Sequence, residues 1–267
     1  MQETGSSITV RRRALADLLS IKDGDDFHDY LLDEGIRRYA LARGERGLGF
    51  GRVLAICANK REARALRKYA FDEIVLSGIT PPSDELQAYI AGDDRCRYIQ
   101  QNSECLTLES QSFDLVICKE GIHHLVRPVL GVYEMLRITR DAILVIEPAD
   151  TLIGRLLERF GLASVYETNQ SGNIRYRDNY VYRWSVRQFD SLLKSYYLES
   201  GYRLDVTIGW MSSKFNANGK AWLRRSAALA GWLASLLPGS RGNYMTALII
   251  AGRDMPGDPM PVAVAAE

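Results

Sequence analysis

The chain has 267 residues, of which 46% are hydrophobic and 25% charged, which is enough apolar material for a folded protein with a sizeable core. Its formal net charge of +1 provides no general attraction for nucleic acid, so we expect no nucleic-acid partner. Four cysteines without CxxC spacing and only three histidines predict no metal site, and the lack of a leader-like or long apolar segment favours a cytoplasmic protein.

The first half of the chain alternates between strand-like and helix-like segments. Residues 1–10 are small and polar, and we expect them to be disordered, whereas residues 11–44 carry apolar side chains at helical spacing. The expected strands are 52–57, 73–77, 96–100, 113–118 and 142–148, and the expected helices are 61–70, 83–91 and 129–138. Continuous apolar strands joined by helices predict a doubly wound, mainly parallel α/β sheet.

The pattern changes after Pro148. Helical runs at 151–162 and 186–198 flank a polar and aromatic stretch, and strand-like runs at 202–210 and 244–252 flank a further helical segment. We therefore expect a single domain over residues 11–253, because the last two strands return to the sheet. Its helical cap insertions would lie at about 151–200 and 215–240, and residues 254–267 would form a flexible tail.

The helical segment near the C-terminus contains an apolar run at residues 227–239. This run is too short to span a bilayer. A buried cap helix is the favoured interpretation, while contact with a membrane surface, with a second copy of the chain or with a partner protein stays open.

Two segments resemble the small-molecule branch of class I S-adenosylmethionine-dependent methyltransferases. They are FDLVICKEGIHHL at 113–125 and EMLRITRDAILVIEP at 134–148, and the resemblance covers roughly residues 50–150. It implies a Rossmann-like sheet that ends in an antiparallel hairpin, which segments 202–210 and 244–252 suit. It also implies S-adenosylmethionine as the cofactor and a small molecule as the methyl acceptor.

The loop after the first strand of this region departs from the family pattern. The family reads approximately VLDIGCGTG, whereas this chain reads VLAICANKR at 53–61. Ala55 replaces the acid, and Cys57, Asn59 and Arg61 occupy glycine positions. The acid that ends the family's second strand is replaced by Ser77. We interpret this as a degenerate cofactor motif, because side chains at close-approach glycines fill volume that the cofactor needs.

The resemblance assigns cofactor contacts to a set of positions at the ends of the expected strands. Asn102 stands where the family has an acid that faces the adenine. Lys60 and Arg61 suggest an anionic ligand, although a solvated helix start explains them equally well. The complete set of cofactor-binding candidates is Ala55, Cys57, Asn59, Ser77, Asn102 and Cys118.

The candidates for catalysis and substrate binding follow the fourth and fifth expected strands. His123, His124 or Glu120 could remove a proton from a substrate hydroxyl, while the alternative for the histidines is that they shape the loop. The aromatic and arginine-rich stretch 172–185 suits a sugar or a phosphorylated substrate, and residues 179–185 resemble methyltransferase-like proteins encoded with bacterial surface-polysaccharide genes. The candidates for substrate binding are Glu147, Arg175, Tyr180, Tyr182 and Arg183.

These observations leave two functions open. The first is an S-adenosylmethionine-dependent O-methyltransferase that acts on a small molecule or a glycan, including a surface polysaccharide. The second is a methyltransferase-fold protein that has lost S-adenosylmethionine and uses the same cleft for other chemistry or for binding a partner. A nicotinamide-dependent oxidoreductase is disfavoured, because no GxGxxG motif follows the first strand.

Overall fold

The computed structural model describes residues 5–22, 24–160, 166–168, 178–197, 201–210, 221–237 and 241–251. The predicted tail at 254–267 lies outside these residues. Within them, eight strands form one sheet in the order β1-β9-β10-β6-β5-β2-β3-β4. The strands are β1 (Ser7–Arg12), β2 (Arg52–Ile56), β3 (Glu73–Gly78), β4 (Cys96–Gln100), β5 (Phe113–Lys119), β6 (Thr139–Pro148), β9 (Tyr202–Gly209) and β10 (Tyr244–Ala251).

The sheet is parallel except for one strand. β10 runs antiparallel to both of its neighbours, β6 and β9, while the other neighbouring pairs are parallel. The predicted α/β class and the antiparallel C-terminal hairpin are therefore confirmed. A separate small hairpin is made by β7 (Tyr166–Thr168) and β8 (Asp178–Tyr180).

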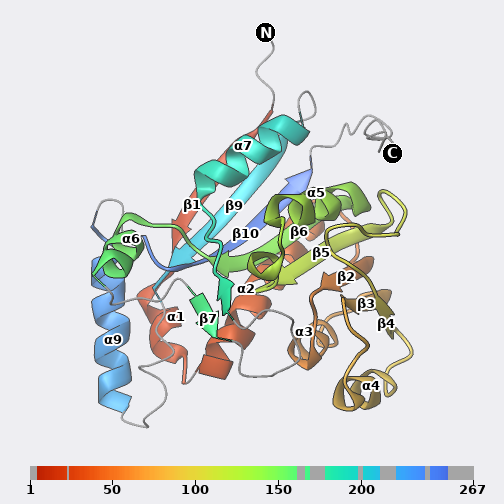
Figure 1. Cartoon of the computed structure of the whole chain (residues 1–267), viewed down its shortest axis with the longest axis horizontal. Coiled ribbons are helices and arrows are strands. Elements are labelled where there is room, and N and C mark those ends of the chain that lie inside the picture. Colours follow the sequence, from red (N-terminus) through yellow and green to blue (C-terminus); the bar gives the residue numbers. More distant parts are fainter. Residues whose placement is uncertain are drawn as a thin grey trace.

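Helices cover both faces of this sheet (Figure 1). The first helices, with α3 and α4, pack on one face, and α5 and α7 pack on the other. Each face has its own apolar core, as expected for strands that are buried on both sides. The helices are α1 (Leu15–Ser20), α2 (Gly24–Gly44), α3 (Lys60–Leu66), α4 (Asp84–Ile90), α5 (Pro128–Ile138), α6 (Leu152–Arg159), α7 (Val186–Tyr196) and α9 (Ala221–Ala234), with a 3₁₀ helix η1 (Ile122–His124).

The N-terminal segment differs from the expectation. Residues 7–10 were predicted to be disordered and 11–12 to begin a helix, but Ser7–Arg12 forms β1, parallel to β9 at one edge of the sheet. Arg11 donates hydrogen bonds of 2.5 and 2.6 Å to the buried carboxylate of Asp205 on β9. Residues 7–12 therefore form a strand because they pair with β9, which lies far along the chain and cannot be recognised as a partner from the local sequence.

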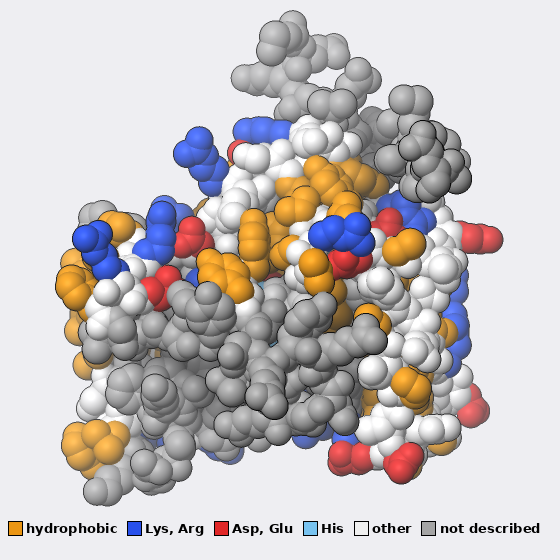
Figure 2. Space-filling view, in the orientation of Figure 1, with side chains coloured by type: hydrophobic (Ala, Val, Ile, Leu, Met, Phe, Trp, Pro, Cys, Tyr) orange, Lys and Arg blue, Asp and Glu red, His pale blue; other side chains and the backbone are white. Residues whose placement is uncertain are grey.

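The expected cap insertions contribute partly to the sheet's covering layers. Phe189, Leu192 and Leu193 of α7 belong to the core that also holds α5, so α7 covers the sheet. A surface groove of about 410 Å³ lies between α5 and α7, and Figure 2 shows hydrophobic side chains gathered over these two helices. Among the described helices, none combines the length and apolar character needed to cross a membrane.

Candidate active site

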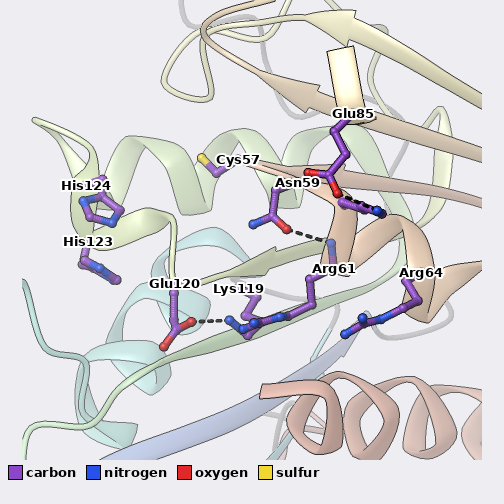
Figure 3. Close-up of a pocket in the computed structure, with 10 residues that line it drawn as sticks. Cys57, Asn59, Arg61, Arg64, Glu85, Lys119, Glu120, His123 and His124 are labelled. Carbon is purple, nitrogen blue, oxygen red and sulfur yellow. Dashed lines mark hydrogen bonds and ion pairs between the residues drawn. The ribbon is translucent and has the colours of Figure 1, made fainter. Parts of the chain in front are cut away.

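A cavity of about 620 Å³ opens where β2 and β5 end (Figure 3). In parallel α/β sheets, the carboxyl ends of the strands are the usual place for a ligand. The volume lies in the range of about 300–1,000 Å³ that is typical of small-molecule sites. The lining residues are Cys57, Asn59, Lys60, Arg61, Arg64, Glu85, Lys119, Glu120, His123 and His124.

Glu147, at the end of β6, holds the loop that carries the two histidines. Its carboxylate accepts hydrogen bonds from the backbone N–H groups of Gly121 (3.0 Å) and Ile122 (2.9 Å), and it lies 2.5 Å from Nδ1 of His123. Glu147 is completely buried and does not line the cavity. A carboxylate at a strand end can face a substrate or cap a loop, and the geometry of Glu147 fits the second, because the carboxylate accepts from three internal donors.

The two histidines lie at one end of the cavity and differ in exposure. His123 is 2% exposed, and the contact with Glu147 assigns its Nδ1 as the donor and fixes the ring. His124 is exposed, and its ring centroid lies 4.2 Å from that of His123. Figure 3 shows both rings on the same side of the cavity, opposite Glu85. The cavity thus has one exposed imidazole, that of His124, which packs against the buried imidazole of His123.

The carboxylate of Glu120 lies at the centre of a cluster of polar side chains. Lys119 forms an ion pair with its carboxylate, the Tyr244 hydroxyl donates a 2.5 Å hydrogen bond, and Nδ1 of His28 lies 3.3 Å away. Burial alone would raise the pKa of Glu120, but the charges of Lys119 and His28 and these hydrogen bonds lower it below its ordinary value. An ionised and paired carboxylate of low pKa is a weak proton acceptor near neutral pH, which disfavours Glu120 as the general base.

Side chains of the loop between β2 and α3 and of the first turn of α3 form hydrogen bonds with the backbone of the same segment. Cys57 adopts a left-handed backbone conformation with φ of 53°, which explains why the family has glycine at this position. Asn59 caps α3 by accepting a hydrogen bond from the Arg61 N–H, and Glu62 accepts one from the Asn59 N–H, which completes a capping box. The backbone N–H groups of Asn59 and Arg61 at this helix start are therefore already used.

Basic side chains dominate the far part of the cavity. Lys60, Arg61 and Arg64 project from α3, and Lys119 ends β5. Nζ of Lys60 lies 2.6 Å from the Glu85 carboxylate at the start of α4. Among the lining residues, four cations stand against the two carboxylates of Glu85 and Glu120.

The predicted cofactor residues separate into two groups. Cys57 and Asn59 line the cavity, whereas Ala55, Ser77 and Cys118 are completely buried and do not. The fourth candidate outside the cavity, Asn102, is exposed, and its side-chain oxygen accepts the Glu104 N–H at 3.0 Å. These four residues are not among those that line the cavity, because strand interiors and a local turn engage them, and their contact with a cofactor stays a prediction.

The described candidates for substrate binding in the aromatic stretch, Tyr180, Tyr182 and Arg183, are not among the residues that line the cavity. Tyr180 is 57% exposed on β8, a strand that contacts η1. Tyr182 accepts a 3.0 Å hydrogen bond from Gln188 and lines the groove between α5 and α7, and Arg183 pairs with Glu158. Arg175 lies outside the described residues.

Sequence reasoning did not single out Arg64, Glu85 or Lys119 as lining residues. Arg64 follows Lys60 at the i,i+4 spacing that puts two side chains on one helix face, which is the signal that could have found it. Glu85 stands in the first turn of the helix that follows β3, near the expected strand end. The described residues contain no group of histidine, cysteine and acidic side chains suited to a metal ion.

Known proteins share this architecture. Residues 47–146 match a family model described as a methyltransferase domain. The YcgJ protein of Bacillus subtilis has 15% identity and a TM-score of 0.50, with 81% of this chain and 98% of that one covered. A protein from Galdieria sulphuraria, provisionally described as a sarcosine dimethylglycine methyltransferase, has 14% identity and a TM-score of 0.51, with 84% and 86% covered. No curated protein sequence matches the chain.

At these identities the structural likeness establishes the fold. Together with the sheet order and the position of the cavity, it shows a class I methyltransferase-like fold, within which residues 47–146 match the methyltransferase-domain model. The methyltransferase-like character predicted from residues 113–125 and 134–148 is confirmed, whereas the small-molecule branch stays a prediction.

Proposed function

We propose that the protein is an S-adenosylmethionine-dependent methyltransferase that acts on a hydroxyl group of a small molecule or a glycan. The observation that carries this proposal is the exposed His124 at the end of a cavity beyond the carboxyl ends of β2 and β5, backed by the anchored His123. The family match at residues 47–146 supports the same activity.

The cavity fits S-adenosylmethionine in position and volume but offers an altered set of contacts. The carboxylate of Glu85, which enters the cavity from the helix after β3, would hold the ribose hydroxyls in place of the missing strand-end acid. Cys57 and Asn59 would face the rest of the cofactor. When bound, S-adenosylmethionine supplies an electrophilic methyl group.

His124 would accept the proton of the acceptor hydroxyl. It is the exposed imidazole of the pair, and an imidazole titrates in the range where it exchanges protons at neutral pH. His123 would act as a positioning residue, because Glu147 fixes its ring and its ring packs against His124. Holding the hydroxyl beside the methyl group would provide most of the acceleration, as a proximity effect.

Calorimetric titration with S-adenosylmethionine and S-adenosylhomocysteine tests the cofactor assignment. We expect micromolar binding that weakens at least tenfold in Glu85→Ala, with Glu109→Ala as a control at an exposed site outside the cavity. Absence of heat at millimolar ligand would contradict the assignment. It would leave the second candidate, a methyltransferase fold without this cofactor, which the closed capping box at Asn59 and the basic lining favour.

Methylation assays with a panel of hydroxylated acceptors test the base. We expect His124→Ala to lower kcat by roughly 100-fold or more and to remove the pH dependence near neutrality. His123→Ala should lower kcat less and leave a pH profile, because the base is still present. Equal activity of His124→Ala and the unmodified protein across the pH range would refute this role.

A further inference from the structure

Two cysteines meet beside the cavity. Cys118 on β5 is the register partner of Ile56 on β2, and Cys57 is the next residue along the chain. Both sulfur atoms lie against Gly121: a Cβ atom at this glycine would be 2.8 Å from Sγ of Cys118 and 3.1 Å from Sγ of Cys57. The two sulfurs therefore share one small space, which exists because residue 121 has no side chain.

The backbone separation of the pair suits a disulfide. Neighbouring strands lie about 4.8 Å apart, and Cys57 directly follows the residue that is the register partner of Cys118. Disulfides span Cα separations of about 4.4–6.8 Å. Both cysteines are free thiols in this structure. Forming the bond would require a turn of the Cys57 side chain away from Oγ of Ser103, which lies 3.5 Å from its sulfur.

The two thiols differ in exposure and acidity. Cys57 is partly exposed and lines the cavity, whereas Cys118 is completely buried. A hydrogen bond with Cys118 lowers the pKa of the Cys57 thiol by more than the thiol's partial burial raises it, and the contact with Ser103 lowers it further. Burial raises the pKa of the Cys118 thiol well above its ordinary value. The accessible thiol is thus the more readily ionised one, which is the condition for oxidation.

We propose that Cys57 is an oxidation site that reacts with a hydroperoxide and then forms a reversible disulfide with Cys118. The Cys57 thiolate attacks one peroxide oxygen, so that an S–O bond forms, the O–O bond breaks and the other oxygen leaves as water or an alcohol after protonation. The Cys118 sulfur then attacks the Cys57 sulfur. An S–S bond forms, the S–O bond breaks, and the hydroxyl leaves as water with the Cys118 proton. The peroxide is the two-electron oxidant throughout.

The disulfide would alter the wall of the cavity. Cys57 lies between β2 and the start of α3 in the left-handed backbone conformation, and it is one of the residues that line the cavity. A disulfide between Cys57 and Cys118 on β5 would remove the Cys57 thiol from the cavity wall. It would also restrain the loop that precedes Asn59. This oxidation chemistry depends only on the two thiols, so it stands independently of the proposed methyl transfer.

The test is oxidation of the full-length protein with hydrogen peroxide, followed by non-reducing peptide mapping and intact-mass measurement. We expect a linked pair of Cys57 and Cys118 peptides, loss of two hydrogens from the intact mass, and full reversal by dithiothreitol. In Cys118→Ser, a sulfenic acid at Cys57 should be trapped by dimedone. In Cys57→Ser, the Cys118 thiol should stay reduced.

Cys96→Ser and Cys105→Ser serve as matched controls, since they remove thiols outside the pair and should leave the link unchanged. The proposal fails if Cys57 and Cys118 both stay free while Cys105 oxidises. It also fails if Cys57 links to Cys105 or Cys96, or if dimedone labels Cys118 and not Cys57.

Discussion

At the scale of single residues, two carboxylates near the cavity accept hydrogen bonds and ion pairs from the protein itself. Glu147 accepts three internal donors, and Glu120 accepts Lys119 and Tyr244. Both residues were predicted from the sequence to act on a substrate. The sequence could place them at strand ends but could not show that neighbouring donors use their lone pairs, because those donors come from other segments.

Removing the Glu147 carboxylate should destabilise the protein strongly. Glu147→Ala leaves two backbone N–H groups and one imidazole N–H buried without an acceptor, which should cost about 3 kcal/mol or more. Glu147→Gln keeps one carbonyl oxygen and should lose less. Urea denaturation measures both, with the exposed Glu109→Ala as control. A loss in Glu147→Ala no larger than in this control would contradict the assigned role.

The Glu120 cluster predicts a pH dependence of stability. Its folded-state pKa is below the ordinary value, so its contribution is present above the unfolded value of about 4.3 and is lost as the pH falls through the lower folded value. The difference in unfolding free energy between the unmodified protein and Glu120→Gln should therefore be fully present above about pH 5 and shrink below about pH 4. A difference that stays constant from neutral to acidic pH would show that Glu120 is not held ionised.

At the scale of elements, runs of apolar residues predicted the presence of the strands well. They predicted the strand boundaries less well where a strand begins with polar residues. The seven predicted strands from 52–57 to 244–252 all form, and six of them are mostly buried, whereas β4 at the edge of the sheet is only partly buried. β6 begins earlier than predicted, at Thr139, since the charged Asp141 is buried there in ion pairs with Arg43 and Arg46. The cavity was only partly predictable, because its lining comes from separate strand ends and helices that are brought together by the fold.

The capping box at α3 gives a prediction at this scale. Asn59→Ala removes the side-chain acceptor that starts the helix and should lower the free energy of unfolding by about 1 kcal/mol. Asn59→Ser keeps an acceptor and should recover most of this loss. Thermal and urea denaturation of the two variants make the comparison. Equal stability of Asn59→Ala and the unmodified protein would mean that the cap contributes nothing to α3.

At the scale of the whole molecule, β1 completes the edge of the sheet. It pairs with β9 along Ser7–Arg12, and Arg11 reaches the buried Asp205. An uncovered edge strand offers unpaired backbone groups to other chains. The N-terminal residues therefore protect β9 as well as contributing contacts of their own.

Deletion of residues 1–12 should lower stability by roughly 2 kcal/mol or more, because it uncovers apolar surface and leaves the Asp205 carboxylate with fewer partners. The exposed β9 edge should also promote self-association, which size-exclusion chromatography with light scattering would detect. Deletion of residues 1–4 is the matched control. A monomer of unchanged melting temperature after the longer deletion would refute the protective role of β1.

The pairing of β1 with β9 has a consequence for biosynthesis. The strands β2 to β6 make up one continuous part of the sheet, in the order β6-β5-β2-β3-β4, so they can associate with one another as they emerge from the ribosome. β1 is made before these strands, but its partner at Tyr202–Gly209 is made after them. β1 must therefore stay unpaired until β9 has been translated, and its addition to the sheet follows the association of β2 to β6.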